Sequence, residues 1–423
     1  MSEDGSGVVP STLLKPAGTS WRRNLYVIWL AEFVAMVGFS AALPFLPYYV
    51  QELGVTAPGQ VEIWSGMLYA AHAVTMGIMG PVWGSLGDRM GRKLMVTRAM
   101  FGGAMFLGAM GFVSSVRQLL VLRILQGAVT GTVGAATALV AAGTPKEQRT
   151  HALGLLQMGI FLGASFGPVL GGVVADVWGY RAPFWVTGAL LAIGGVLVAV
   201  LVREVQGAAS KGEVGSFQGN VRTVLRSAGI LPAFGVRLLV RTAYRMADLV
   251  LPLFVQALMP AHARVSSLVG LVASVRMAAS ATGSVAMGRV GERVGLRRVL
   301  MISIAGCVVS YSLQSVASSF QQLLVLQALA GLSMGGILTS LTAILSRCAP
   351  DGRQGTVFGL DGSVMSVANA VGPMLGGMIA ATWGVRAPFT TAALCFALAA
   401  PVLLVLRARG TDAKTRSTRR CGR

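Results

Sequence analysis

The stretch GSLGDRMGRKLM, at residues 84–95, is the first indication of how the chain is organised. Only 12% of the 423 residues are charged, yet four charges fall within six residues of this stretch. A near-copy, GRVGERVGLRRVL, lies 204 positions later at residues 288–300. A charged motif that an apolar chain contains twice indicates that a larger unit is duplicated.

The composition is that of an integral membrane protein. Hydrophobic residues make up 54% of the chain, mean hydropathy is +0.70, and only 15 residues are acidic. Apolar runs of about 20 residues recur along the chain, as membrane-spanning helices require. The net charge of +20 does not indicate a nucleic-acid partner, because the basic residues lie mainly between the apolar runs and at the chain ends. We therefore expect an all-α protein in a lipid bilayer.

Twelve spans are expected, in two sets of six separated by a polar linker. The domains that follow are an N-terminal tail at 1–23, a first bundle at 24–202, a linker at 203–233, a second bundle at 234–406 and a basic tail at 407–423. The spans themselves are expected near 25–49, 62–84, 94–114, 118–142, 151–175, 183–202, 234–257, 265–288, 297–316, 320–346, 355–381 and 387–406.

Basic residues are distributed unequally between the two sides of the membrane. The six loops on one side contain four of the 35 lysines and arginines, namely Arg117, Arg181, Arg264 and Arg386. Loops rich in lysine and arginine stay in the cytoplasm. Both termini are therefore expected in the cytoplasm.

The two sets of spans are copies of each other. Three further pairs of segments match in the same order at offsets of 204 or 205: QLLVLR and QLLVLQ at 118–123 and 322–327, GPVLGG and GPMLGG at 167–172 and 372–377, WGYRAPF and WGVRAPF at 178–184 and 383–389. Duplicated bundles can rock against each other around a central site, which then opens to each side of the membrane in turn.

The charged motif resembles the loop signature of the major facilitator superfamily, G-x-L-x-D-R-x-G-R-K. We place it in the loop between the second and third spans, where its glycines would permit a tight turn. The acid could hold arginines or helix N–H groups in one conformation only, which would make the motif a conformational latch. The alternative is that its charges simply anchor a short cytoplasmic turn. The matching residues are Gly84, Leu86, Asp88, Arg89, Gly91, Arg92 and Lys93, with Gly288, Gly291, Glu292, Arg293, Gly295 and Arg297 in the copy.

The fifth span resembles the antiporter motif of twelve-helix drug:proton antiporters in this superfamily. Its small residues allow close helix contact, and its proline removes one backbone hydrogen bond, which suits a hinge or a tight seal. Ordinary small-residue packing is the alternative. The motif G-x8-G-x3-G-P-x2-G-G is complete in Gly154, Gly163, Gly167, Pro168, Gly171 and Gly172.

Arg123 and Gln126 lie in the fourth span within LRILQG, which resembles the superfamily signature R-x-x-Q-G. A buried arginine is costly in lipid and needs a partner or a wet cavity. The resemblance implies a role for Arg123 in proton coupling, and a structural ion pair is the alternative. Its repeat partner is Gln327, and we expect Gln126 and Gln327 to line the substrate cavity.

Three acids fall inside the expected spans: Glu32, Asp248 and Asp361. A carboxylate held away from water favours its neutral form, so these are the candidate proton carriers. Glu32 is the best candidate. Asp361 is expected near enough to the cytoplasm to stay solvated, and Asp248 could serve only as the counter-ion of Arg245, one turn earlier.

The seventh span has arginines along one face. Arg237, Arg241 and Arg245 follow at intervals of four residues, with Asp248 three residues later. Facing a cavity, Arg241 and Arg245 would favour an anionic or zwitterionic ligand. Alternatively Arg241 reaches the cytoplasmic interface, as we expect of Arg237. Arg276 of the eighth span is a possible partner.

We expect a secondary transporter that exports small toxic molecules in exchange for protons. The alternatives are a proton-coupled transporter of one metabolite, anionic or not, and a polytopic receptor or membrane enzyme. No nucleophile motif, metal-ligand spacing or phosphate-cradling loop is visible, so we expect no cofactor, no metal and no enzymatic activity. We expect a monomer in the inner membrane of a bacterium.

Overall fold

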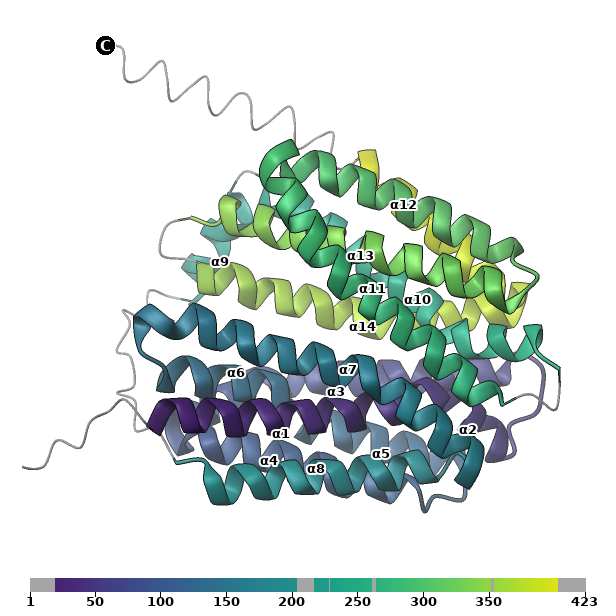
Figure 1. Cartoon of the computed structure of the whole chain (residues 1–423), viewed down its shortest axis with the longest axis horizontal. Helices are drawn as coiled ribbons and strands as arrows, with labels where there is room; N and C mark the ends of the chain where they lie inside the picture. The colour runs from purple at the N-terminus through teal and green to yellow at the C-terminus, as the bar shows by residue number, and fades with distance from the viewer. Residues whose placement is uncertain (1–19, 204–216, 228, 261–263, 351–353, 402–423) are drawn as a thin grey trace, which may run out of the picture.

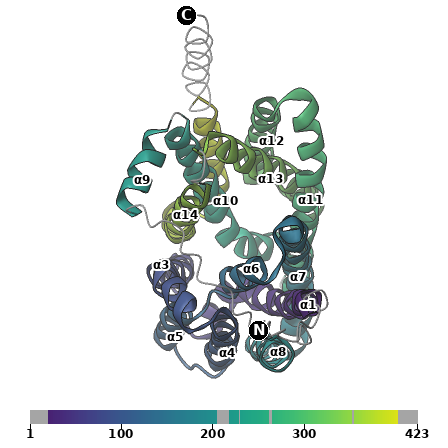
Figure 2. The ribbon, with the colours of Figure 1, turned by 90° about the vertical axis from the view of Figure 1, so that its left-hand side faces the viewer.

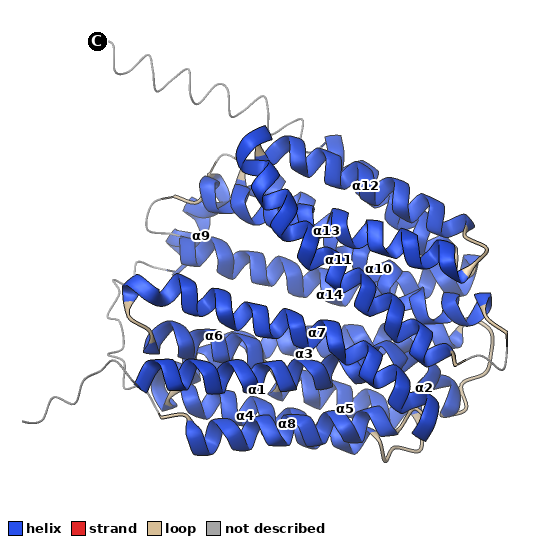
Figure 3. Cartoon of the chain, in the orientation of Figure 1, coloured by secondary structure: helices blue, strands red, loops and turns tan. Residues whose placement is uncertain are grey.

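The computed structural model describes residues 20–203, 217–227, 229–260, 264–350 and 354–401. Within these ranges all regular structure is helical and no strand occurs (Figure 3). The expected all-α fold class is therefore confirmed.

The first half of the chain forms the lower bundle in Figure 1. Its first and fourth spans are each interrupted, so that two helices take the place of one. The elements are α1 (Ser20–Ala42), η1 (Leu43–Phe45), α2 (Leu46–Glu52), α3 (Gln60–Met90), α4 (Arg92–Met110), α5 (Val116–Val129), α6 (Thr132–Gly143), η2 (Lys146–Gln148), α7 (Arg149–Trp178) and α8 (Ala182–Leu201).

The second half forms the upper bundle. A short helix, α9, precedes it within the stretch expected to be the linker and packs on α10 and α14. The elements are α9 (Phe217–Arg226), α10 (Ile230–Leu258), α11 (Val265–Val294), α12 (Leu296–Val316), α13 (Phe320–Cys348), α14 (Gln354–Trp383) and a last helix, Ala387–Pro401.

Helices stand at all twelve expected positions in the described part of the chain. Eight of the spans are long and apolar enough to cross a membrane by length and composition alone. The other four positions hold α3, α4, α10 and the helix Ala387–Pro401. Helix α10 contains three arginines and an aspartate, which lower its apolar character.

The charged motif does not form a loop, contrary to expectation. Helix α3 continues to Met90, so Gly84 and Arg89 are helical, and only Gly91 makes the turn, with φ at 104°. In the copy, α11 continues to Val294 and Gly295 makes the turn, with φ at 98°. A positive φ is cheap only for glycine, so one residue suffices to join two long helices.

The basic residues after the turn bind carbonyl groups of their own bundle. Arg92 donates to the carbonyl oxygen of Ala138 on α6, and Lys93 to that of Ala199 on α8, each at 2.8 Å. The side chain of Asp88 lies outside the described part of the structure. The motif thus ties α4 to two neighbouring helices at the end of the molecule where α1 begins.

The two bundles meet along two pairs of helices. Helix α3 lies against α14, and α7 lies against α11, as the end-on view shows (Figure 2). Helix α2 also contacts α10. We call the end of the molecule that holds α2, the last turns of α7 and the first turns of α11 the closed end (right in Figure 1).

Polar contacts join the bundles at the closed end. The carboxylate of Asp176, near the end of α7, accepts hydrogen bonds from the backbone N–H groups of Ser266 and Ser267 at 3.2 and 2.8 Å. These N–H groups belong to the first turn of α11, whose positive dipole end favours an anion. Tyr48 donates to the carbonyl of Pro252. Asp176 therefore caps a helix of the opposite bundle.

Packing at the closed end repeats the duplication. Tyr49 packs on Phe184 with ring centroids 5.1 Å apart, and Phe254 packs on Phe389 at the same distance. The sequences around the first members of these pairs, LPYYVQEL at 46–53 and LPLFVQAL at 251–258, match at offset 205. This match makes each position of the first span equivalent to the position 205 residues later in the seventh.

Candidate functional site

Glu32 is the most deeply buried acid in the described structure. It lies in the middle of α1 and has no exposed surface. Neither carboxyl oxygen has a hydrogen-bond partner in the structure. Its polar neighbour is Thr132, the first residue of α6. A carboxylate is expensive to bury without partners, so this environment favours the neutral acid.

Arg123 is also buried, but it does not pair with an acid. Its side chain on α5 is 1% exposed, donates to the carbonyl oxygen of Leu68 at 3.2 Å and to Oε1 of Gln126 at 2.7 Å. The guanidinium lies 5.6 Å from the ring centroid of Tyr69. The ion-pair alternative for Arg123 is therefore wrong within the described residues, and its role in coupling stays a prediction.

The fourth span is broken between α5 and α6. Thr130 is extended, and Gly131 has φ at 125° and ψ at 38°, so the chain leaves helical geometry for two residues. The equivalent glycine of the second bundle, Gly335, lies inside the unbroken helix α13. Sequence reasoning missed this break because the same glycine occurs in both halves.

Asp248 joins two arginines in the second bundle. Its carboxylate binds Nη1 of Arg245 at 3.1 Å and Nη2 of Arg276. Both partners were expected from the sequence and are confirmed. The ring of Tyr244 lies 5.3 Å from the guanidinium of Arg241 and 5.1 Å from that of Arg276, so an aromatic face adds to the cluster.

Arg237 and Asp361 form a buried ion pair, contrary to expectation. Nη2 of Arg237 lies 2.8 Å from Oδ2 of Asp361, and each residue is 7% exposed. Arg237 therefore does not reach the interface, and Asp361 is not solvated. The pair satisfies both charges at once, which a buried arginine in lipid requires.

Arg241 has no acidic partner among the described residues. Its Nε donates to Oδ1 of Asn369 on α14 at 3.2 Å, and Arg245 donates to the same oxygen at 2.8 Å. Four arginines thus gather near two acids, Asp248 and Asp361, and the cluster has an excess of positive charge. Asn369 was not singled out from the sequence, since nothing there pairs it with α10.

The two glutamines expected to line the cavity are buried. Gln126 is fully buried beneath Arg123, and Gln327, which is 1% exposed, donates to Oε1 of Gln314 at 3.0 Å. Neither amide is available to a ligand in this conformation. Their role in substrate binding stays a prediction.

The glycines of the fifth span pack helices together. Gly163, Gly167 and Gly171 each face the backbone of α1, at Phe33, Val37 and Ala41 in turn. Gly172 instead faces the backbone of Ser266 on α11, while Gly154 has no atom within 4 Å of its Cβ position. Four of the motif glycines are therefore needed for close packing, and one of these four for contact between bundles.

The contact at Gly172 has an equivalent in the second half. Gly377 on α14 faces the backbone of Glu62 on α3, so this kind of contact occurs in both pairs of helices between the bundles. The residue preceding it in each half, Gly171 or Gly376, faces the first helix of its own bundle. In each half, therefore, the first of two adjacent glycines allows close packing within its bundle, and the second allows close packing against the opposite bundle.

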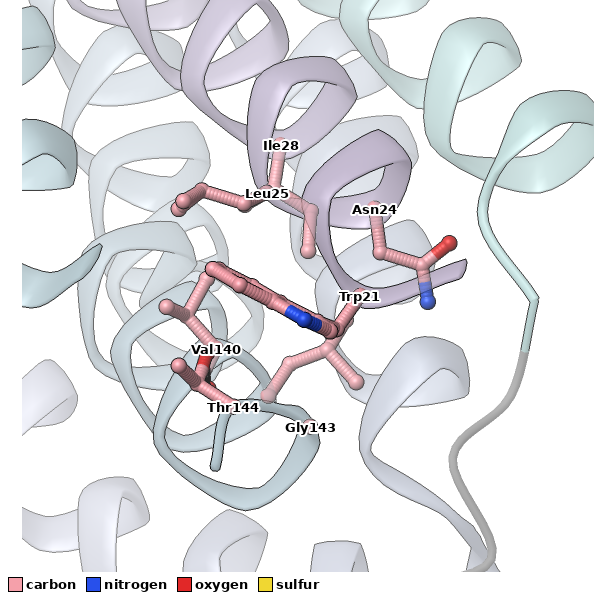
Figure 4. Close-up of a pocket in the computed structure, with 8 residues that line it drawn as sticks. Trp21, Asn24, Leu25, Ile28, Val140, Gly143 and Thr144 are labelled. Atoms are coloured by element: carbon pink, nitrogen blue, oxygen red, sulfur yellow. Dashed lines mark hydrogen bonds between the residues drawn. The ribbon is translucent and has the colours of Figure 1, made fainter. Parts of the chain in front are cut away.

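A small pocket lies between the start of α1 and the end of α6 (Figure 4). Trp21, Leu25 and Val140 make most of its wall apolar. Its two polar side chains already have partners, because Asn24 exchanges hydrogen bonds with the backbone of Arg203 and Thr144 donates to Val140. The pocket belongs to the packing of the first bundle.

Comparisons with known proteins agree with this architecture. The model of the Major Facilitator Superfamily matches residues 28–260 and 233–420. The chain is 31% identical over 384 residues to the multidrug resistance protein MdtG of Proteus mirabilis, covering 90% of this chain and 96% of that one. It is 32% identical over 374 residues to MdtG of Salmonella arizonae, covering 88% and 93%.

A solved structure shares the fold at low sequence identity. It is the crystal structure of a bacterial homolog to the human lysosomal transporter Spinster, in an inward-facing and unoccupied conformation. The TM-score is 0.74 and the identity is 14%, with 92% of this chain and 97% of that chain covered. The expected fold is thereby confirmed.

Proposed function

Because the chain belongs to the major facilitator superfamily of membrane transporters, we propose that it exports small toxic molecules or drugs in exchange for protons. The export of drugs is supported by the relatives called multidrug resistance proteins. Alternating access is supported by the two bundles, which contact each other through α3 with α14 and α7 with α11.

The observation that carries the proton coupling is the isolation of Glu32. Asp248 and Asp361 are both held by arginines, whereas Glu32 has no charged partner and no exposed surface. An acid in such a place changes charge when its surroundings change, as a proton carrier must. Glu32 is therefore the carrier in this proposal, with Arg123 as the buried cation of the same bundle.

The test is flux in liposomes that contain the purified full-length protein. A pH gradient imposed without ATP should drive ethidium, a cationic dye, against its concentration gradient, and a protonophore should abolish the accumulation. Protein-free liposomes are the control. If ethidium and the anionic dye carboxyfluorescein both move at the same rate with and without the gradient, proton-coupled export is wrong.

The arginine cluster favours a second candidate function, the transport of an anionic compound. Arg245 is paired with Asp248, whereas the acceptor of Arg241 is the uncharged Asn369. An anionic group of a ligand could therefore supply the counter-charge of Arg241. In the liposome assay this candidate predicts carboxyfluorescein transport without ethidium transport. The variant Arg241→Gln should then lower the rate for the anionic dye several-fold.

We further propose that the closed end faces the outside of the cell, so that this conformation opens inward. Each of the six loops at the closed end is short, and four basic residues occur in or beside them, at Arg117, Arg181, Arg264 and Arg386. Lysine and arginine concentrate on the cytoplasmic side, so the closed end is the outer one. Both termini are then cytoplasmic.

Thiol labelling of whole cells checks this orientation. The four native cysteines, at positions 307, 348, 395 and 421, are first replaced by serine. In that background Glu52→Cys should react with an impermeant thiol reagent, because Glu52 lies at the closed end with 37% of its side chain exposed. Lys211→Cys should react only after the cells are opened. The reverse pattern would refute the orientation.

Asp88→Asn is expected to lower the transport rate several-fold without loss of folded protein. The substitution removes the negative charge of the motif but keeps its size, so a contact with arginines or helix N–H groups weakens. Glu147, an exposed acid within η2 at the same end, provides the matched control, and Glu147→Gln should transport normally. Normal transport by Asp88→Asn at normal abundance would leave only the anchoring role.

A further inference from the structure

The break in the fourth membrane span coincides with the isolated acid of the first span. Thr130 and Gly131 leave helical geometry, and α6 begins anew at Thr132, in the middle of the bundle. A helix that begins there presents N–H groups without intrahelical partners and the positive end of its dipole. Helix α6 packs against α1, and Thr132 is the polar neighbour of Glu32.

We propose that the N-terminus of α6 stabilises the ionised form of Glu32 after proton release. Thr132 and Gly131 are the residues that position this helix end beside Glu32. This inference rests on the proposed role of Glu32 as the proton carrier. In this conformation both carboxyl oxygens of Glu32 are buried without a hydrogen-bond partner among the described residues, and Thr132 is their polar neighbour. In this proposal Glu32 is neutral here. Contacts from the Thr132 hydroxyl and the first N–H groups of α6 form when the charge appears.

In the described part of the chain, no charged side chain of the helices packed on α1 lies near Glu32. Helices α6, α7 and α8 and the turn η1 pack on α1. Helices α6 and α8 and the turn η1 contain no titratable residue. Helix α7 has Arg149, His151 and Asp176, each about 18 Å or more along its axis from Gly163, which lies against Phe33.

The charged and titratable residues in the first half of α1 are also far from Glu32. Arg22 and Arg23 lie about 14 Å along the axis, and Tyr26 lies about 9 Å away, with 60% of its surface exposed. Arg123, the buried cation of the bundle, is held by Leu68 and Gln126. Arg98 of α4 stacks its guanidinium on the ring of Trp83, 3.6 Å from the centroid. Among the positive groups on the elements that pack against α1 in the described residues, the helix end is therefore the one that lies at Glu32.

The duplicated bundle acts as an internal comparison. The position equivalent to Glu32 is Arg237, whose charge is balanced by Asp361. In that bundle the fourth helix, α13, runs unbroken through Gly335. The break thus occurs only in the half that contains an acid without a counter-charge, although both halves have the glycine that would permit it.

The experiment titrates Glu32 directly in the purified full-length protein. Glu32 is identified as the infrared band of a protonated carboxyl that Glu32→Gln lacks, and its loss is followed as pH rises. In Thr132→Val the midpoint should move to higher pH by about one unit, since the charged form loses a hydrogen bond. Thr132→Ser should keep the parent midpoint. Thr137→Val is the matched control, because the Thr137 hydroxyl binds the Val133 carbonyl of its own helix.

A second variant acts on the break itself. In Gly131→Ala the added Cβ would meet no neighbouring atom of the described residues. The backbone conformation at this position is nevertheless strained for every residue except glycine. Because the substitution favours a continuous helix, it should move the midpoint in the same direction. Unchanged midpoints in both Thr132→Val and Gly131→Ala, or a parent with no band that depends on Glu32, overturn the inference. If the flux does not depend on the pH gradient, the proposed function is wrong. The titration of Glu32 would still test the inference in that case.

Discussion

Replacing Glu32 by glutamine is expected to reduce pH-driven flux to the level of protein-free liposomes while equilibrium binding of the dye persists. Glutamine has nearly the same shape as the neutral acid that fits this site but cannot release a proton. The bundle should therefore fold, and binding should continue, although the coupling step is lost. Flux under an imposed pH gradient and dye binding at equilibrium are measured on the same preparation.

The control for this prediction is a change of the same kind elsewhere. Glu52→Gln alters an acid at the closed end whose ion pair with Arg181 is more than one-third exposed, so little change is expected. His72 lies on α3, where we expect a neutral, packed histidine, so His72→Ala should also matter little. Arg123→Ala should instead uncouple flux from the gradient. If Glu32→Gln pumps as well as the parent, Glu32 is not the carrier, and Asp248 or Asp361 would have to leave its arginine partners to replace it.

Valine at Gly172 is expected to shift the protein away from the conformation described here. A side chain at this position would overlap the backbone of Ser266 across the contact between α7 and α11. Overpacking costs about 1–3 kcal/mol, which corresponds to about a 5–150-fold change in the ratio of two conformations. Spin labels at Gln51→Cys and Gln256→Cys, whose side chains are hydrogen-bonded in this conformation, should report a longer distance in Gly172→Val.

The neighbouring glycine supplies the matched control. Valine at Gly171 would overlap the backbone of Ala41 on α1, within the same bundle. Because α1 and α7 stay together when the bundles rock, this variant should lower the thermal stability in detergent without favouring either conformation. If Gly171→Val and Gly172→Val both leave the spin-label distance unchanged, the contact at Gly172 does not control the closed end.

Most of the fold could be predicted from the sequence because the chain is duplicated. Matching segments at a nearly constant offset indicate two similar bundles, and apolar runs give the position of each span. The charged motif was placed less well, because apolar periodicity does not reveal where a charged helix end stops. Helix α3 continues through Asp88 and Arg89 to Met90, and a single glycine makes the turn.

The contacts of the candidate site could be predicted from the sequence only where the two partners are close in the sequence. Asp248 lies one turn from Arg245, so their ion pair follows from helical spacing. Asp361 lies 124 residues from Arg237, and only the packing of α14 on α10 brings them together. The break before α6 could not be predicted either, since the glycine that permits it occurs in both halves while only one of them bends.

The polar contacts at the closed end must break each time this end opens, and their free energy can be compared with that supplied by a proton. Asp176 on the first turn of α11 and the exposed pair Gln51 and Gln256 are polar contacts that water can replace. Each contributes a net stabilisation of about 0.5–1.5 kcal/mol, or up to about 3 kcal/mol for the charged group. One proton crossing a potential of 100 mV releases about 2.3 kcal/mol. In the proposed exchange with protons, the free energy that one proton supplies is therefore of the same order as that of a single polar contact at the closed end.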